Sequence, residues 1–313
     1  MYKNIHDNRR GFTLVELLIV ITIIGILASL ATVGIMAVRK AAVQAWIKTQ
    51  MSQVSTALEA YKSNYSEYPP SLADQTATMR HVSNRWMRAG NVTYKDVLLA
   101  AGVDENDIDE LIDSEGKQIK DPRWDKIHLI SLRFWLGGYF DVNRMKSTGF
   151  AADLSNPFAT GASQRMNPLF DFDEKNLMTV NLGHGSIYVF TVRDNPLVYF
   201  RGSKTTGYGS AADITSIQNV SMDNYGVAIP YAKSLLLNDD GSLKEIVWYE
   251  SEKYQLVHPG LDDKFSSGIT RASVLAWLAG PSAANVDNGL TSADLDNITN
   301  FTDSATLDAM VKQ

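Results

Sequence analysis

The sequence has no cysteine among its 313 residues. This absence excludes disulfides, thiolate zinc sites and cysteine nucleophiles together. An exported protein without disulfides must stabilise its long loops by other means, and a bound metal ion is one of them. The sequence also lacks an excess of basic residues, since its net charge is −6. A mildly acidic chain argues against non-specific binding to nucleic acid, so we expect no nucleic-acid partner.

Patterns that mark catalytic sites are missing as well. The histidines make no HExxH motif and no other close-spaced pair of metal ligands. They are His6, His81, His128, His184 and His258. The segment 202–205, Gly-Ser-Lys-Thr, is only superficially similar to a P-loop, because a serine separates the glycine from the lysine. We therefore predict that the protein is not an enzyme.

One long apolar run stands near the N-terminus. Residues 12–38 contain a single charged side chain, Glu16, and Lys3, Arg9 and Arg10 precede the run. A helix of this length is about 40 Å long, enough to span the hydrocarbon core of a bilayer. The positive-inside rule keeps the basic residues in the cytoplasm and exports the C-terminal bulk. An ordinary signal peptide fits badly, since its apolar stretch is shorter and a small-residue cleavage site follows it.

The stretch GFTLVELLIVITIIGILASL, residues 11–30, resembles the N-terminus of type IV prepilins and type II secretion pseudopilins. In that family a membrane prepilin peptidase cuts after the glycine and methylates the new first residue. The resemblance implies cleavage between Gly11 and Phe12, and methylation of Phe12. It also implies that Glu16 meets the N-terminal amine of a neighbouring subunit during assembly. The alternative is that Glu16 only lies near the membrane interface, although a carboxylate inside hydrocarbon is more often functional.

From residue 39 the apolar side chains recur at steps of three and four residues. This spacing predicts an amphipathic helix that continues the apolar run and packs one face on a globular domain. Tyr68-Pro69-Pro70 is expected to end the helix. The stretch ALEAYKSNYSEYPP resembles the corresponding helix end of major pseudopilins. The predicted buried face consists of Val43, Ile47, Met51, Val54, Leu58, Tyr61 and Tyr65.

The rest of the chain is predicted to form an exported head of the α+β class. Helices are expected at 93–101, 105–113 and 125–136, with Gly137-Gly138 as a helix stop. Strands are expected at 186–190, 197–200, 244–249 and 254–257. The family resemblance implies a pilin-like fold, in which the long N-terminal helix packs on an antiparallel sheet and further helices are inserted.

The predicted organisation has four parts. They are a leader (1–11), a transmembrane and polymerisation helix (12–38), an amphipathic helix (39–68) and the head (69–313). Within the head, an insertion of about 71–220 and a C-terminal loop at 258–301 are distinguished.

The C-terminal loop resembles the calcium-binding loop of major type II secretion pseudopilins. The resemblance implies a Ca²⁺ site, whose expected ligands are Asp262, Asp263, Asp294 and Asp296. Asp262 matches the first aspartate of the family and Asp296 most plausibly the second, whereas Asp263 stands in place of a glycine. Calcium takes six to eight oxygen ligands, which carboxylates and loop carbonyls supply. The alternative is that these aspartates are solvated turn formers. Residues 269–293, with a helix-like segment at 273–280, are an insertion relative to the short form of the loop.

The resemblance implies a structural subunit of a type II secretion pseudopilus. Such a subunit is held in the inner membrane with its head in the periplasm before it is assembled into a filament. The expected partners are copies of itself, prepilin peptidase, minor pseudopilins, the secretion assembly platform and inner-membrane lipid.

Two alternatives stay open. A type IV pilin or minor pilin for adhesion, motility or DNA uptake is disfavoured because many such pilins have a C-terminal disulfide loop. A membrane-anchored enzyme or ligand-binding module is kept open by the large region 71–220.

Overall fold

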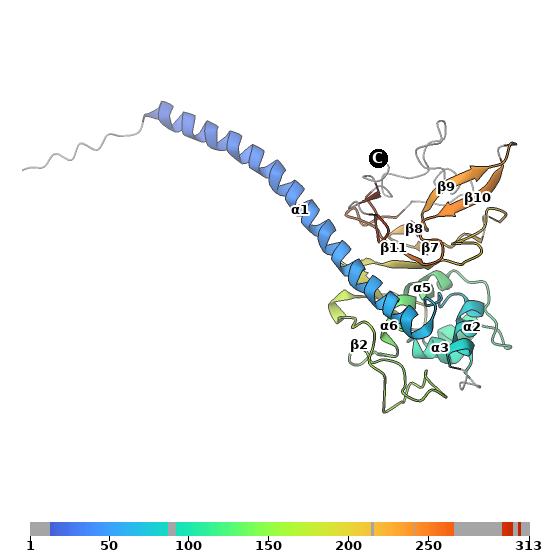
Figure 1. The fold of residues 1–313 in the computed structure, drawn as a ribbon. Helices are drawn as coiled ribbons and strands as arrows, with labels where there is room; N and C mark the ends of the chain where they lie inside the picture. The colour runs from blue at the N-terminus through green and yellow to red at the C-terminus, as the bar shows by residue number, and fades with distance from the viewer. Residues whose placement is uncertain are drawn as a thin grey trace, which may run out of the picture. The chain divides into compact units, whose positions relative to one another are not determined.

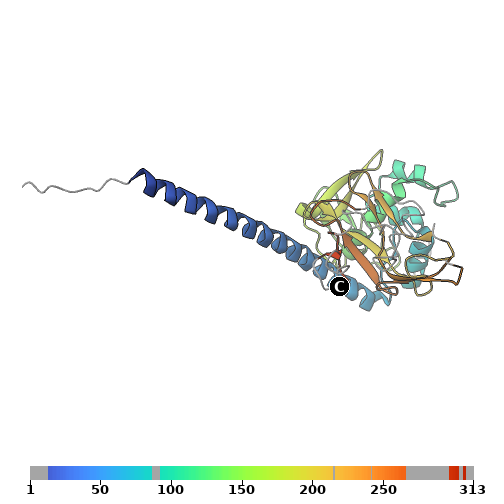
Figure 2. The ribbon, with the colours of Figure 1, turned by 90° about the horizontal axis from the view of Figure 1, so that it is seen from above.

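The fold is taken from a computed structural model, which describes residues 13–86, 92–213, 216–240, 242–265, 296–302 and 306–307, without the side chains of 30–34 and 235. The chain divides into two compact units, residues 1–43 and 44–313. Helix α1 (Leu14–Tyr65) has 52 residues and contributes to both. Both ribbon views draw it as one uninterrupted helix (Figure 1 and Figure 2).

The second half of α1 supplies one wall of the core of the head. Five of the seven side chains predicted for the buried face are at most 1% exposed, whereas the two at its ends, Val43 and Tyr65, are partly exposed. The five are Ile47, Met51, Val54, Leu58 and Tyr61. The helix ends at Tyr65, and Ser66 takes a left-handed conformation with φ 61°. The predicted stop near the Tyr-Pro-Pro sequence is therefore confirmed to within three residues.

Five short helices follow α1 in the described part of the chain. They are α2 (Gln75–Arg85), α3 (Tyr94–Ala100), α4 (Glu105–Leu111), α5 (Arg123–Leu129) and α6 (Ser131–Gly137). Side-chain caps fix the start of α2, α3 and α4, because the carboxylates of Asp74 and Asp104 and the hydroxyl of Thr93 accept backbone N–H groups. The helices predicted at 93–101 and 105–113 are confirmed, and α2 was not predicted.

The helix predicted at 125–136 is two helices in the structure. Ile130 ends α5, and its N–H bonds to the carbonyl of Ile127 at 3.3 Å, one residue closer than in an α-helix. This tightened turn separates α5 from α6. The predicted glycine stop is confirmed, because Gly138 ends α6 with φ 74°.

The strands of the described residues form five small sheets whose ladders are antiparallel. The larger ones are β3 (Leu177–Asn181), β4 (Ser186–Val192) and β5 (Asn195–Pro196), then β6 (Val198–Arg201), β11 (Tyr254–His258) and β12 (Ile298–Thr299). Three hairpins pair β1 (Phe140–Asp141) with β2 (Lys146–Ser147), β7 (Val220–Met222) with β8 (Gly226–Ala228), and β9 (Ala232–Leu237) with β10 (Leu243–Trp248). A 3-10 turn, η1 (Glu174–Asn176), precedes β3. All four predicted strands are present, so the α+β class is confirmed.

Within the head, α2, α3, α5 and α6 gather at one end and β7 to β11 at the other (Figure 1). Aromatic rings fill the space among the helices, with Phe134 and Trp135 centroids 4.8 Å apart and Trp86 and Trp135 centroids 6.4 Å apart. This aromatic core holds together the helical end of the head.

Candidate functional site

Glu16 lies in the first turn of α1 and makes a reciprocal cap with Thr13. The backbone N–H and the hydroxyl of Thr13 donate to Glu16 Oε2 at 2.9 and 2.8 Å, and the N–H of Glu16 donates to Thr13 Oγ1 at 3.2 Å. This is a capping box, which places a carboxylate at the positive end of the helix. The sequence analysis missed this cap, although a Thr-x-x-Glu spacing at the start of a helix is the pattern typical of a capping box. Gly11 and Phe12 lie outside the described residues.

The first half of α1 has exposed apolar side chains at successive positions. Leu17, Leu18, Ile19, Val20 and Ile21 are each 45–58% exposed. Because successive residues of a helix point in different directions, apolar surface surrounds this segment on every side. Apolar surface of this extent marks a contact with lipid or with another protein. In the part of the chain that the structure describes, no helix is both long enough and apolar enough to cross a membrane.

Two of the predicted calcium ligands lie at the turn that follows β11. Asp296 Oδ2 accepts the N–H groups of Leu261 and Asp262 at 2.7 and 3.1 Å. Gly260 has φ 74°, and a Cβ there would stand 2.6 Å from the carboxylate of Asp296. The glycine is therefore required by both its conformation and the close approach. Asp262 Oδ1 accepts the N–H of Lys264 at 2.9 Å.

Asp263, the third predicted ligand, directs its carboxylate to other partners. Asp263 Oδ1 accepts the amide of Asn195 at 2.5 Å and lies 3.9 Å from Arg193 Nη1. Asp294 lies outside the described residues. Among the described residues, one group of three possible metal ligands has its ligand atoms within 4.8 Å of one another. It is described below and does not include these aspartates. The structure therefore brings Asp262 and Asp296 together, and calcium stays a prediction.

A protein cation already contacts the same C-terminal segment. The ammonium of Lys48 on α1 donates to the carbonyls of Thr299 and Thr302 at 2.7 and 2.6 Å, and to the hydroxyl of Thr302 at 2.9 Å. Charge-assisted hydrogen bonds of this kind are about twice as strong as neutral ones. The sequence placed Lys48 on the polar face of the helix and gave no sign of this contact.

The three-ligand group consists of Asp107, Glu110 and His184. Asp107 is fully buried, and its two oxygens accept the N–H groups of His184 and Gly185 at 3.0 and 2.8 Å. Glu110 accepts from Arg123 at 2.7 Å and contacts His184 Nε2 at 2.9 Å. The hydrogen bonds from His184 and then Arg123 lower the pKa of Glu110, and the bond to Glu110 raises the pKa of His184.

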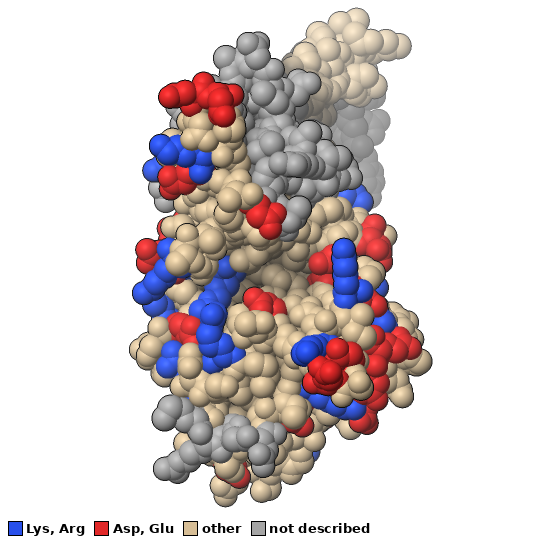
Figure 3. Space-filling model, turned by 90° about the vertical axis from the view of Figure 1, so that its right-hand side faces the viewer, with Lys and Arg blue, Asp and Glu red and all other residues tan. Residues whose placement is uncertain are grey.

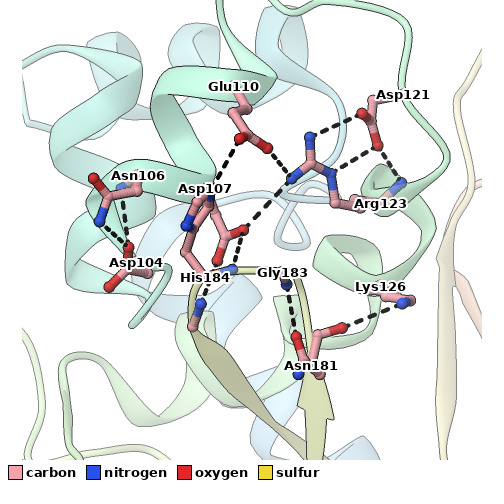
Figure 4. Close-up of polar contacts among 11 residues, drawn as sticks. Asp104, Asn106, Asp107, Glu110, Asp121, Arg123, Lys126, Asn181, Gly183 and His184 are labelled. Atoms are coloured by element: carbon pink, nitrogen blue, oxygen red, sulfur yellow. Dashed lines mark hydrogen bonds and ion pairs between the residues drawn. The ribbon is translucent and has the colours of Figure 1, made fainter.

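Arg123 lies among the carboxylates of this group, as Figure 4 shows. Its guanidinium is 2.7 Å from Glu110, 3.0 Å from Asp121 and 3.5 Å from Asp107. The arginine therefore supplies the cation that the carboxylates require. The group ties α4 and α5 to the β3–β4 turn, which is a structural role. His184 lies 77 residues from Asp107 and 74 from Glu110, so sequence spacing could not predict the group.

The buried imidazole of His81 links a partly exposed carboxylate to a buried hydroxyl. His81 contacts Glu67 Oε1 at 2.8 Å and the Tyr61 hydroxyl at 2.6 Å. The bond from His81, with help from Arg201, lowers the pKa of Glu67 to about 2, and burial lowers the pKa of His81. Tyr61 is 0% exposed, whereas the side chain of Glu67 is 25% exposed. These contacts join α1, α2 and the segment between them.

The helix with a capped glutamate and apolar surface on all sides is the feature that prepilin N-termini share. The family described as the prokaryotic N-terminal methylation motif matches residues 6–32. This match confirms the resemblance seen in the sequence of residues 11–30, whereas cleavage after Gly11, methylation of Phe12 and the role of Glu16 in assembly stay predictions.

The N-terminal part is similar to type II secretion system core protein G. Over 63 residues, or 20% of this chain, it is 39% identical to that protein of Klebsiella michiganensis and 38% identical to those of Klebsiella pneumoniae and Escherichia coli K12. The matched segment spans 43–45% of these curated relatives, which is less than half their length. No solved structure gives a significant match.

Proposed function

We propose that the chain is a structural, pilin-like subunit of a type II secretion pseudopilus. The observation that carries this proposal is the methylation motif at residues 6–32, at the start of a 52-residue helix. The similarity to core protein G favours secretion over the two alternatives, a type IV pilin and a pilin-anchored enzyme or binding module. In this role the protein has no catalytic site and acts by assembling.

Before assembly, the subunit is held in the inner membrane with its head in the periplasm. The basic residues ahead of the apolar run support this orientation. Prepilin peptidase removes residues 1–11 and methylates Phe12. Afterwards, neighbouring subunits replace lipid around the apolar half of α1. The small residues Gly25 and Ala28 allow helices to approach closely there.

Glu16 sets the register between subunits in this proposal. Among the described residues of the single chain, its carboxylate is bonded locally, to Thr13. An incoming amine of Phe12 from a neighbour would offer a stronger, charge-assisted partner. Exchange of the local cap for this ion pair removes a charge from an apolar environment and aligns the two helices.

The further partners in this role are minor pseudopilins and the secretion assembly platform. The C-terminal loop binds Ca²⁺ through Asp262 and Asp296, which lie at one turn and supply hard oxygen ligands. A cation there would strengthen the closure of the loop that the Lys48 ammonium begins.

The experiment that tests the proposal compares Glu16→Ala with Thr13→Ala in the native host. Both variants lose the capping box, but only Glu16→Ala loses the carboxylate. We expect Glu16→Ala to leave the head folded and to reduce the sheared filament fraction at least tenfold, with Thr13→Ala close to wild type. Equal assembly by all three proteins would contradict the pairing of Glu16 with a neighbour, and absence of wild-type filaments would contradict the function.

A further inference from the structure

The head contains a cleft whose charge is opposite to that of the chain. Its volume is about 870 Å³, and it lies between the end of α1, α2, β6 and the turn before β11. Six basic side chains line it, against three acidic ones, Glu67, Asp74 and Glu252, although the chain as a whole carries −6. The basic ones are Lys62, Arg80, Arg85, Arg201, Lys204 and Lys253. On the face drawn in Figure 3, Lys and Arg side chains gather beside a hollow.

Three of the six basic side chains have an acidic partner, since Arg201 and Arg85 share Glu67 and Lys253 lies 3.0 Å from Glu250. Glu67 is bound by His81 and Arg201, at 2.8 and 2.7 Å, and lies 3.7 Å from Arg85. Asp74 caps α2 by accepting the N–H of Ala77 at 2.9 Å.

Several of the basic side chains are left without an acidic partner. Within the described part of the chain, neither Arg80 nor Lys204 has a carboxylate within 4.0 Å, and both side chains are exposed. Lys62 stands over the ring of Tyr68, 4.5 Å from its centre. Cations on a concave wall reinforce one another's field, so the cleft attracts an anionic partner.

The same chain offers an acidic segment of matching character. Residues 104–115 contain seven Asp and Glu and no Lys or Arg. Glu105 and Asp109 on α4 are 65% and 59% exposed, and they share Lys95. Glu115, in the turn beyond α4, is 69% exposed. None of these residues lines the cleft of its own chain.

We propose that the basic cleft of one copy binds the acidic segment 104–115 of a second copy. Cleft and segment are different surfaces, so the contact is heterologous and leaves an unused cleft at one end and an unused segment at the other. Contacts of this kind extend into open chains, which is the arrangement of a filament. The inference rests on the proposed function for bringing copies together, but the contact itself belongs to the head.

The absence of cysteine permits a direct test on the full-length chain in detergent. One batch carries Ser203→Cys at the cleft and a second carries Asn106→Cys on α4, both neutral positions. The control batch carries Thr160→Cys, which is exposed and belongs to neither surface. After mixing and mild oxidation, we expect the 203–106 dimer in at least tenfold excess over the 203–160 dimer. The excess should fall as salt rises to about 1 M, where screening reaches about 3 Å.

Charge reversal identifies the charges involved. Arg80→Glu with Lys204→Glu in the first batch should reduce the 203–106 dimer at least tenfold. Glu105→Lys with Glu115→Lys in the second batch should then restore it. We expect the fold to survive these changes, because Lys95 retains its ion pair with Asp109 and Glu115 lies at the surface. Circular dichroism of each variant verifies this. Equal dimer yields for the 106 and 160 positions, or no response to reversal, would overturn the proposal.

The two proposals fail in distinguishable ways. Glu16→Ala should leave the 203–106 dimer unchanged, because the contact is between heads. Wild-type filaments without the 203–106 cross-link would overturn the cleft contact and leave the pseudopilus function standing. The cross-link without filaments would support the contact and count against the function.

Discussion

Replacement of Lys48 by methionine isolates the bonds that its ammonium makes to the C-terminal segment. Methionine keeps most of the apolar stem and removes the three donated bonds to Thr299 and Thr302. Both threonines are buried, at 0% and 6% exposure, so their carbonyls lose a charged donor where water has little access. A bond to a charged group contributes about 1.5–3 kcal/mol, and three that share one ammonium are not additive. We expect a loss of about 3 kcal/mol in the free energy of unfolding.

The assay is thermal unfolding of the full chain in detergent, followed by circular dichroism. For a head of this size, about 3 kcal/mol corresponds to a decrease in Tm of about 5–10 °C. Hydrogen exchange should increase first in residues 296–302, because this segment loses the contact directly. The matched control is Lys40→Met, an exposed position on the same helix, which should change Tm by less than about 1 °C.

Two results would refute this reasoning. If Lys48→Met unfolds within about 0.5 kcal/mol of wild type, the ammonium bonds contribute no more than water would. If exchange increases evenly over the head, Lys48 acts through general packing and not through the C-terminal segment.

Three further predictions concern processing, metal and pH. Mass spectrometry of filaments from the native host should find methylated Phe12 as the first residue, and intact Met1 in filaments would contradict cleavage. EDTA should lower Tm in wild type but not in Asp262→Ala or Asp296→Ala, and calorimetry without calcium binding would make the loop an ordinary turn. Glu67 has a pKa lowered to about 2, so its stabilising effect, at most about 3 kcal/mol, should be complete above about pH 4.5 and be lost as pH falls towards 2. Glu67→Gln should flatten that part of the stability profile, and an unchanged acid transition would contradict the role of His81 and Arg201.

Periodicity predicted the elements in which one face is buried. In α1 the side chains from Ile47 to Tyr61 alternate between core and solvent, so the 3.6-residue period is visible in the sequence. The starts of α3 and α4 also carry a local signal that was not used, since Thr93 and Asp104 are cap residues directly before them.

Periodicity failed for helices that are buried on every side and for helices that bury only a few residues. All seven residues of α6 are buried, so the sequence could not show that a turn at Ile130 separates it from α5. In α2 only Thr78, His81 and Val82 are buried, and two of these three are polar. Its position depends on the contacts of His81 with Tyr61 and Glu67, which lie in another part of the chain.

The site residues divide in the same way. Glu16 could be singled out because a local motif contains it, although its cap with Thr13 was missed. The roles of Lys48 and Asp107 could not be predicted, because their partners lie 251 and 77 residues further along the chain. When the partners of a polar side chain are backbone groups far away in the sequence, no spacing of residue types indicates the contact.

These distant polar contacts show how a chain without cysteine connects its parts. Lys48 joins α1 to the C-terminal segment, and Asp107 joins α4 to the β3–β4 turn. His258 on β11 is fully buried, and its Nε2 lies 2.8 Å from the carbonyl of Val192 on β4. A disulfide acts largely by restricting the unfolded chain, whereas these contacts exist only in the folded head. They can therefore break and re-form one at a time as the head opens locally. A calcium ion at Asp262 and Asp296 would act beside Lys48 on the same segment, so the EDTA and Lys48→Met effects should be more than additive if both cations close one loop.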